Sequence, residues 1–167
     1  MNTVKLTVPT IADQKLIYDL FLEGVNLNVY DKKLIENLDH LKAMANRMAS
    51  CPCDFDAAAT RNISNYMCTL NDENIGFITL AHDIKINEFE IWYFSLDKKY
   101  QHQGYGKKYF AEVCEMIENR KMSSSILVRT KNSKAILSIL EQNGFRSDYT
   151  NREGFLSFSK NTNVIRL

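Results

Sequence analysis

The stretch "EIWYFSLDKKYQHQGYG", from Glu90 to Gly106, joins an apolar run to a turn that contains two glycines. The run is apolar at successive positions, which is typical of a strand covered on both faces. Helical spacing begins at Gly104. Where a strand leads into a helix, the first N–H groups of the helix have no partner within it, and glycine lets the backbone approach a ligand closely. Such a junction is suited to binding phosphate.

Two lysines follow the turn, where a helix is expected to begin. A cation in the first helical turn costs about 0.3–1 kcal/mol, and a bound polyphosphate would reverse the sign of that interaction for Lys107 and Lys108. The alternative is that the lysines are solvated and the glycines only turn the chain. The turn lacks the G-x-x-x-x-G-K-[ST] pattern, and Tyr109 breaks the dinucleotide pattern G-x-G-x-x-G.

The rest of the chain predicts an α/β fold. Its 167 residues fit one domain, residues 1–167. The predicted order is β-α-α-β-β-β-α-β-α-β-β, with a hairpin about "NDEN" and a parallel, right-handed crossover from Glu88 to Thr130. We expect a mixed sheet of about six or seven strands with helices on both faces. The first helix is predicted to be capped by Thr10 and to stop at Gly24, and the second to begin at Asp31. The stretch "SCPCDFDAAATRN" is predicted to be a loop.

Composition argues against several classes of function. The formal net charge is +1, which gives no support for nucleic-acid binding by bulk charge. No apolar run of about 18 residues is present to span a membrane. The N-terminus shows no signal-peptide pattern, so we expect a cytoplasmic protein.

The cysteines do not form a recognisable metal or redox motif. Cys51 and Cys53 are spaced C-x-C, and no histidine or further cysteine lies near enough in sequence to complete a zinc site. We expect free thiols and no metal.

Two segments resemble the GNAT superfamily of N-acetyltransferases. "Q-x-x-G-Y-G", beginning at Gln101, is similar to the acyl-CoA signature [QR]-x-x-G-x-[GA] of that family. The spacing between this motif and the preceding strand also resembles that of the family's central strand, bulge, loop and helix. Downstream, "NSKAILSILEQNGF" resembles the family's asparagine-containing helix that ends in Gly-Phe. The resemblance covers Glu88 to Phe145 well, and the remainder only by the order of elements.

The resemblance implies acetyl-CoA as co-substrate. The coenzyme diphosphate would lie on main-chain amides at the start of the helix, and the pantetheine arm would pair with the preceding strand like an extra strand. From the next helix, Asn132 or Ser133 would approach the pantetheine. His102 lies in the turn, where it could donate to a phosphate; the alternative is a solvated loop histidine. The full predicted coenzyme set is Phe94, Ser95, Leu96, Gln101, His102, Gln103, Gly104, Tyr105, Gly106, Lys107, Asn132 and Ser133.

Glu90 is the predicted general base. An amine attacks a thioester only when neutral, and a base helps to remove its proton. A carboxylate inside an apolar strand is expected to have a raised pKa. Glu90 also matches the strand glutamate that the resemblance implies as base in the histone-acetyltransferase branch. The alternative is that Glu90 pairs with a lysine or caps a strand edge, and Glu88 is a second choice for the base.

The expected general acid is missing. Many family members have a tyrosine four residues before the glycine of "GF", and this chain has Leu140 there. Either CoA leaves as the thiolate, or another phenol serves, with Tyr93, Tyr105 and Tyr149 as candidates.

These features predict an N-acetyltransferase that transfers acetyl directly from acetyl-CoA to a primary amine. The acceptor would be a small molecule, a peptide or a protein. A different acyl donor is a second enzymatic alternative. The alternative from another class is a non-catalytic acyl-CoA-binding or partner-binding domain. A homodimer is compatible with the sequence, which does not decide it.

Overall fold

The computed structural model describes residues 3–120, 124–130, 134–150 and 156–162. Its strands form one eight-stranded sheet, in the order β1-β3-β4-β5-β6-β8-β7, with β2 also paired to β3. The strands are β1 (Val4–Thr7), β2 (Cys53–Asp56), β3 (Arg61–Leu70), β4 (Glu73–Asp83), β5 (Glu88–Leu96), β6 (Ser124–Thr130), β7 (Arg146–Thr150) and β8 (Leu156–Thr162). The helices are α1 (Gln14–Asn26), α2 (Leu38–Ser50), α3 (Tyr105–Glu118) and α4 (Lys134–Gln142), with 3-10 turns η1 (Ile11–Asp13), η2 (Lys32–Ile35) and η3 (Lys98–Tyr100).

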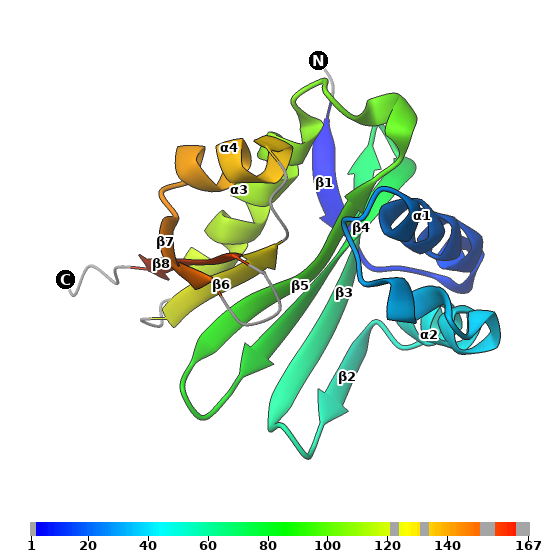
Figure 1. Cartoon of the computed structure of the whole chain (residues 1–167), viewed down its shortest axis with the longest axis horizontal. Helices are drawn as coiled ribbons and strands as arrows, with labels where there is room; N and C mark the ends of the chain where they lie inside the picture. Colours follow the sequence, from blue (N-terminus) through cyan, green and yellow to red (C-terminus); the bar gives the residue numbers. More distant parts are fainter. Residues whose placement is uncertain (1–2, 121–123, 131–133, 151–155, 163–167) are drawn as a thin grey trace.

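Helices cover both faces of the sheet, as predicted (Figure 1). The pair α1 and α2 packs on one face through a cluster that includes Phe21, Leu41 and Phe77. The helices α3 and α4 pack on the other face, where Phe110 and Leu140 meet residues of β4, β5 and β6. Burial of these apolar side chains supplies the main driving force for the layered arrangement.

The mixed character of the sheet is confirmed. Strands β5 and β6 are parallel, and they are joined through α3. The β3–β4 pair is an antiparallel hairpin that turns at Asn71 and Asp72, both with positive φ. Residues with an Asn or Asp side chain tolerate this left-handed conformation best after glycine.

Three expectations about elements are wrong. The sheet has eight strands, not six or seven, because Cys53–Asp56 forms an edge strand on β3 inside the segment predicted to be a loop. The second helix begins at Leu38, capped by the Asn37 side chain, after a separate 3-10 turn. The first helix does not stop at Gly24 but continues to Asn26.

Gly24 has a packing role instead of a terminating one. A Cβ built on it would come within 2.4 Å of the Tyr30 ring. The absence of a side chain therefore lets Tyr30 lie directly against α1. At the other end of this segment, the predicted cap is confirmed: Thr10 and Asp13 form a capping box.

Candidate active site

The open edge of β5 defines the candidate site. The register between β4 and β5 shifts between Thr79 and Leu80, where Trp92 is the extra residue of a bulge. The parallel pairing of β5 with β6 runs from Glu88 to Ile91 and stops there. The remainder of β5 therefore diverges from β6, and its outer edge faces a cavity.

A cavity of about 290 Å³ joins this open edge to the start of α3. It brings together three β5 residues, the glycine turn, α4 and the segment after α1. Its lining residues are Glu23, Gly24, Leu27, Val29, Phe94, Ser95, Leu96, Gln101, His102, Gly104, Gly106, Lys107, Ile136 and Ile139. The cavity has an apolar wall and, at the turn, a polar end with a lysine.

The glycine turn has the conformation that the sequence predicts for close approach of a ligand. Gly104 is the N-cap of α3, with φ 82°, and His102 is also left-handed, with φ 58°. No heavy atom lies within 4 Å of a Cβ built on Gly104, so the space in front of it is open. The first N–H groups of α3 are directed out of the helix at this point. Positive φ and the open space fit these residues to a bound diphosphate.

Eight of the predicted coenzyme residues line this cavity. Gln103 and Tyr105 are not among its lining residues. The Gln103 side chain donates to the Lys99 carbonyl at 2.6 Å, and the Tyr105 ring is buried beside Tyr100. Their main-chain amides stay in the predicted set. Asn132 and Ser133 lie outside the described residues.

The two lysines after the turn differ. Lys107 lines the cavity, whereas the Lys108 ammonium lies 5.7 Å from the centre of the Tyr105 ring. A cation over an aromatic face is a stabilising contact that needs no ligand. Lys107 is therefore the lysine that can meet a phosphate group in the cavity.

Glu90 is buried, with 7% of its surface exposed, and lies outside the set of described residues that line the cavity. Its neighbours Phe89 and Ile91 pack toward α3, so its own side chain points to the opposite face of the sheet. There the Glu90 carboxylate lies 3.6 Å from the Arg61 guanidinium. Arg61 also lies 3.6 Å from the Asp83 carboxylate and 5.9 Å from the centre of the Trp92 ring.

The other candidate acid and base residues are engaged elsewhere. Glu88 accepts a hydrogen bond from the Ser125 hydroxyl at 3.1 Å. Leu140 is fully buried in the core between the sheet and α3, so the position of the usual tyrosine is a packing position. Burial raises the pKa of Tyr93, whose ring stacks edge-on to Phe21 at 4.9 Å. The side chain of Tyr149 lies outside the described residues.

Two hydrogen bonds from side chains to the open edge were missed by sequence reasoning. The Gln101 amide donates to the Leu96 carbonyl at 2.7 Å, and the Tyr30 hydroxyl donates to the Phe94 carbonyl at 2.9 Å. Gln101 was predicted only for its main chain. Tyr30 is 64 positions from Phe94, and no local sequence signal connects them.

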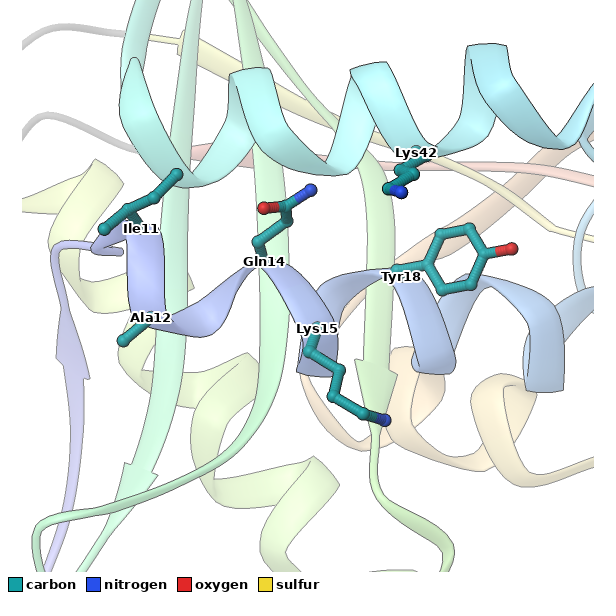
Figure 2. A pocket seen from close by; sticks show the side chains of 6 residues that line it. All are labelled: Ile11, Ala12, Gln14, Lys15, Tyr18 and Lys42. Carbon is teal, nitrogen blue, oxygen red and sulfur yellow. The ribbon is translucent and has the colours of Figure 1, made fainter.

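A second hollow lies between the start of α1 and α2 (Figure 2). It has a volume of about 420 Å³ and is lined by Ile11, Ala12, Gln14, Lys15, Tyr18 and Lys42. Gln14 extends toward α2, whereas Lys15, which pairs with Asp19, extends to the other side of α1. No residue of β5 or α3 lines this hollow, and its described lining carries no carboxylate or thiol. The chemistry therefore favours the cavity at β5.

A family model described as "Acetyltransferase (GNAT) family" matches residues 35–145, which is more than half of the chain. The chain belongs to this family. Members of the GNAT family are acetyltransferases that use acetyl-CoA, and this chain is accordingly an N-acetyltransferase with acetyl-CoA as its co-substrate. A search of curated proteins by sequence gave no significant match.

Solved structures of this family share the fold across nearly the whole chain. PaiA N-acetyltransferase from Thermoplasma acidophilum, in complex with coenzyme A, is 16% identical with a TM-score of 0.66, covering 95% of this chain and 98% of its own. An acetyltransferase from Thermus thermophilus is 12% identical with a TM-score of 0.68, covering 95% and 97%. The ribosomal-protein-S18-alanine N-acetyltransferase from Escherichia coli is 15% identical with a TM-score of 0.61, covering 100% and 99%.

The structure also bears on metal and membrane expectations. Within the described ranges, no group of three His, Cys, Asp or Glu side chains is arranged to hold a metal ion. All four cysteines are free, with Cys68 and Cys114 buried. None of the helices that the structure describes has the length and apolar character needed to cross a membrane.

Proposed function

We propose that this GNAT protein transfers acetyl directly from acetyl-CoA to the primary amine of a small molecule or peptide, in the cavity between β5 and α3. The observation that carries the proposal is the geometry of this cavity. One continuous space connects outward N–H groups at the start of α3 with the unpaired edge of β5. A peptide amine is included because a protein of the same fold is named for acetylating a ribosomal protein.

The predicted coenzyme residues divide into two groups with different tasks. Amides from Gln101 to Lys107 would hold the diphosphate, assisted by the Lys107 ammonium and the positive end of the α3 dipole. Phe94, Ser95 and Leu96 would line the pantetheine arm. Asn132 or Ser133, on the predicted approach from the next helix, completes the set.

Acetyl-CoA supplies a thioester whose carbonyl carbon accepts the amine. A main-chain N–H of the open β5 edge would donate to the carbonyl oxygen, on which negative charge grows as the amine attacks. Donors fixed before the reaction stabilise such charge most effectively, because they do not need to reorient. The rigid pairing of β5 with β4 provides this fixation.

Glu90 is the proposed general base. Its carboxylate is buried next to Arg61, which keeps a negatively charged form compensated within the sheet. Glu90 precedes Phe94 by four positions, or about 13 Å along an extended strand. Proton transfer from the amine to Glu90 would therefore run through water.

A second candidate function is a non-catalytic acyl-CoA-binding domain. The observation that favours it is Leu140, a fully buried core residue where many family members have a tyrosine. In the catalytic alternative, CoA leaves as the thiolate or takes its proton from another phenol.

A thiol-release assay distinguishes the two functions. Acetyl-CoA is supplied with a panel of diamines, amino acids, aminoglycosides and short peptides, and free CoA thiol is measured. We expect amine-dependent release with at least one class. Binding of acetyl-CoA by calorimetry without release from any amine would support the non-catalytic domain, and absence of binding would contradict both functions.

A further inference from the structure

The main-chain groups of β5 that face the cavity can be identified from the ladder with β4. In an antiparallel pair, residues alternate between pointing both main-chain groups at the partner strand and pointing both away. The Asp97 N–H donates to the Ile75 carbonyl at 2.8 Å, so this pair is hydrogen-bonded. By alternation, Ser95 also bonds to β4, whereas Phe94 and Leu96 direct their N–H and C=O groups outward.

Both outward carbonyls already accept hydrogen bonds from side chains. The Phe94 carbonyl accepts from the Tyr30 hydroxyl at 2.9 Å, and the Leu96 carbonyl accepts from the Gln101 amide at 2.7 Å. The pairing with β6 stops at Ile91, so β6 does not occupy this edge. The edge therefore directs two N–H donors outward, and each of its two carbonyls already accepts one hydrogen bond from within the protein.

The packing around Tyr30 holds its hydroxyl at the Phe94 carbonyl. Its ring lies edge-on to Tyr93, with centroids 5.5 Å apart and an interplanar angle of 90°, and it packs against Phe21 and Gly24. Burial raises the pKa of its phenol well above the ordinary range. The hydroxyl therefore stays protonated and remains a donor at neutral pH.

We propose that Tyr30 is a positioning residue for the pantetheine arm: its hydrogen bond to the Phe94 carbonyl fixes this edge of β5, so that the outward main-chain groups are held in place for the arm. This inference rests on the proposed function, because it assumes that the arm lies along β5. Tyr30 itself is not among the residues that line the cavity, so its effect passes through Phe94 and Ser95.

Calorimetry with two ligands tests this role. Acetyl-CoA carries the whole arm, whereas 3′-phosphoadenosine 5′-diphosphate carries the nucleotide and diphosphate without it. We expect Tyr30→Phe, which keeps the ring and its packing, to bind acetyl-CoA about five- to tenfold more weakly, because the hydrogen bond that fixes the β5 edge is lost. Its affinity for the nucleotide fragment should stay within about twofold of wild type.

Tyr109→Phe is the matched control. Tyr109 is fully buried in a different core cluster, and its hydroxyl has no hydrogen-bond partner within the described part of the chain. This variant should bind both ligands like wild type, and the melting temperature of each apo variant checks its folding.

The other outcomes separate the two proposals. Unchanged affinity of Tyr30→Phe for acetyl-CoA, or an equal loss for both ligands, overturns the role of Tyr30 and leaves the proposed function standing. Wild-type protein that binds the fragment and acetyl-CoA equally well shows that the arm contributes nothing, which also overturns this role. Wild-type protein that binds neither ligand overturns the proposed function itself.

Discussion

The two halves of β5 have opposite surroundings. From Glu88 to Ile91 the strand is paired on both edges, and its polar side chains meet Arg61 and Ser125. After the bulge at Trp92, one edge is open, and the polar groups that matter are main-chain amides. A single strand thus keeps a side-chain region for a proton acceptor apart from a main-chain region for a coenzyme. Changes in one half should affect turnover, and changes in the other should affect binding.

The largest expected effect is on turnover, from Glu90→Gln. Loss of a general base lowers rates by about 10²–10⁴-fold. Calorimetry should show acetyl-CoA affinity close to that of wild type. Equal turnover of both proteins on a good amine would remove Glu90 from the mechanism.

The second largest expected effect is the loss of acetyl-CoA binding in Gly104→Val. A valine at φ 82° is strained and also fills the space in front of the α3 amides. Acetyl-CoA at 100 times its Kd should stabilise wild type by about 2.7 kcal/mol, measured as a rise in melting temperature. This rise should be lost in the variant.

Gly144→Val is the matched control for Gly104→Val. Gly144 has φ 79°, with open space around a built Cβ, and it follows α4. The control should lower the melting temperature of the apo protein by a similar amount but keep the rise with acetyl-CoA. A rise that persists in Gly104→Val would place the ligand elsewhere.

Gly24→Ala should have a smaller effect, now on stability. Alanine improves helix propensity by up to about 1 kcal/mol, whereas overpacking against the Tyr30 ring costs about 1–3 kcal/mol. We expect net destabilisation of about 1 kcal/mol in urea denaturation. Combination with Tyr30→Leu, which provides room for the methyl group, should remove the overpacking. A stabilised Gly24→Ala protein would contradict the close packing of Tyr30 on α1.

The smallest expected effect is that of Arg61→Gln. The Arg61 side chain is 27% exposed and its two ion pairs are long, at 3.6 Å. We therefore expect the free energy of unfolding to fall by less than about 1 kcal/mol. A double-mutant cycle with Glu90→Gln measures the coupling between the two side chains. A coupling energy of zero would show that the ion pair does not stabilise Glu90.

The sequence predicted those parts of the fold whose signals are local. The apolar β5 run, the glycine turn and the helix after it follow each other without interruption, and each has its own composition. Strand β2 was missed because a four-residue edge strand with two aspartates has no buried face to produce a pattern. The end of α1 was misplaced because Gly24 serves the packing of Tyr30, which is a tertiary contact.

The candidate site shows the same division. The residues of the turn were identified because they are contiguous, and eight members of the predicted set do line one cavity. The hydrogen bonds from Tyr30 and Gln101 to β5 depend on how α1 and the turn pack against the sheet. Local sequence patterns therefore do not predict them.

The covered carbonyls of β5 also affect how this chain meets other chains. A free strand edge is a template for aggregation because it alternates donors and acceptors, and any extended segment can continue that pattern. The Phe94 and Leu96 carbonyls each accept one hydrogen bond from within the protein, so an incoming strand would have to share these acceptors with Tyr30 and Gln101. The open edge that admits a ligand is thereby a less favourable template for a strand of another chain.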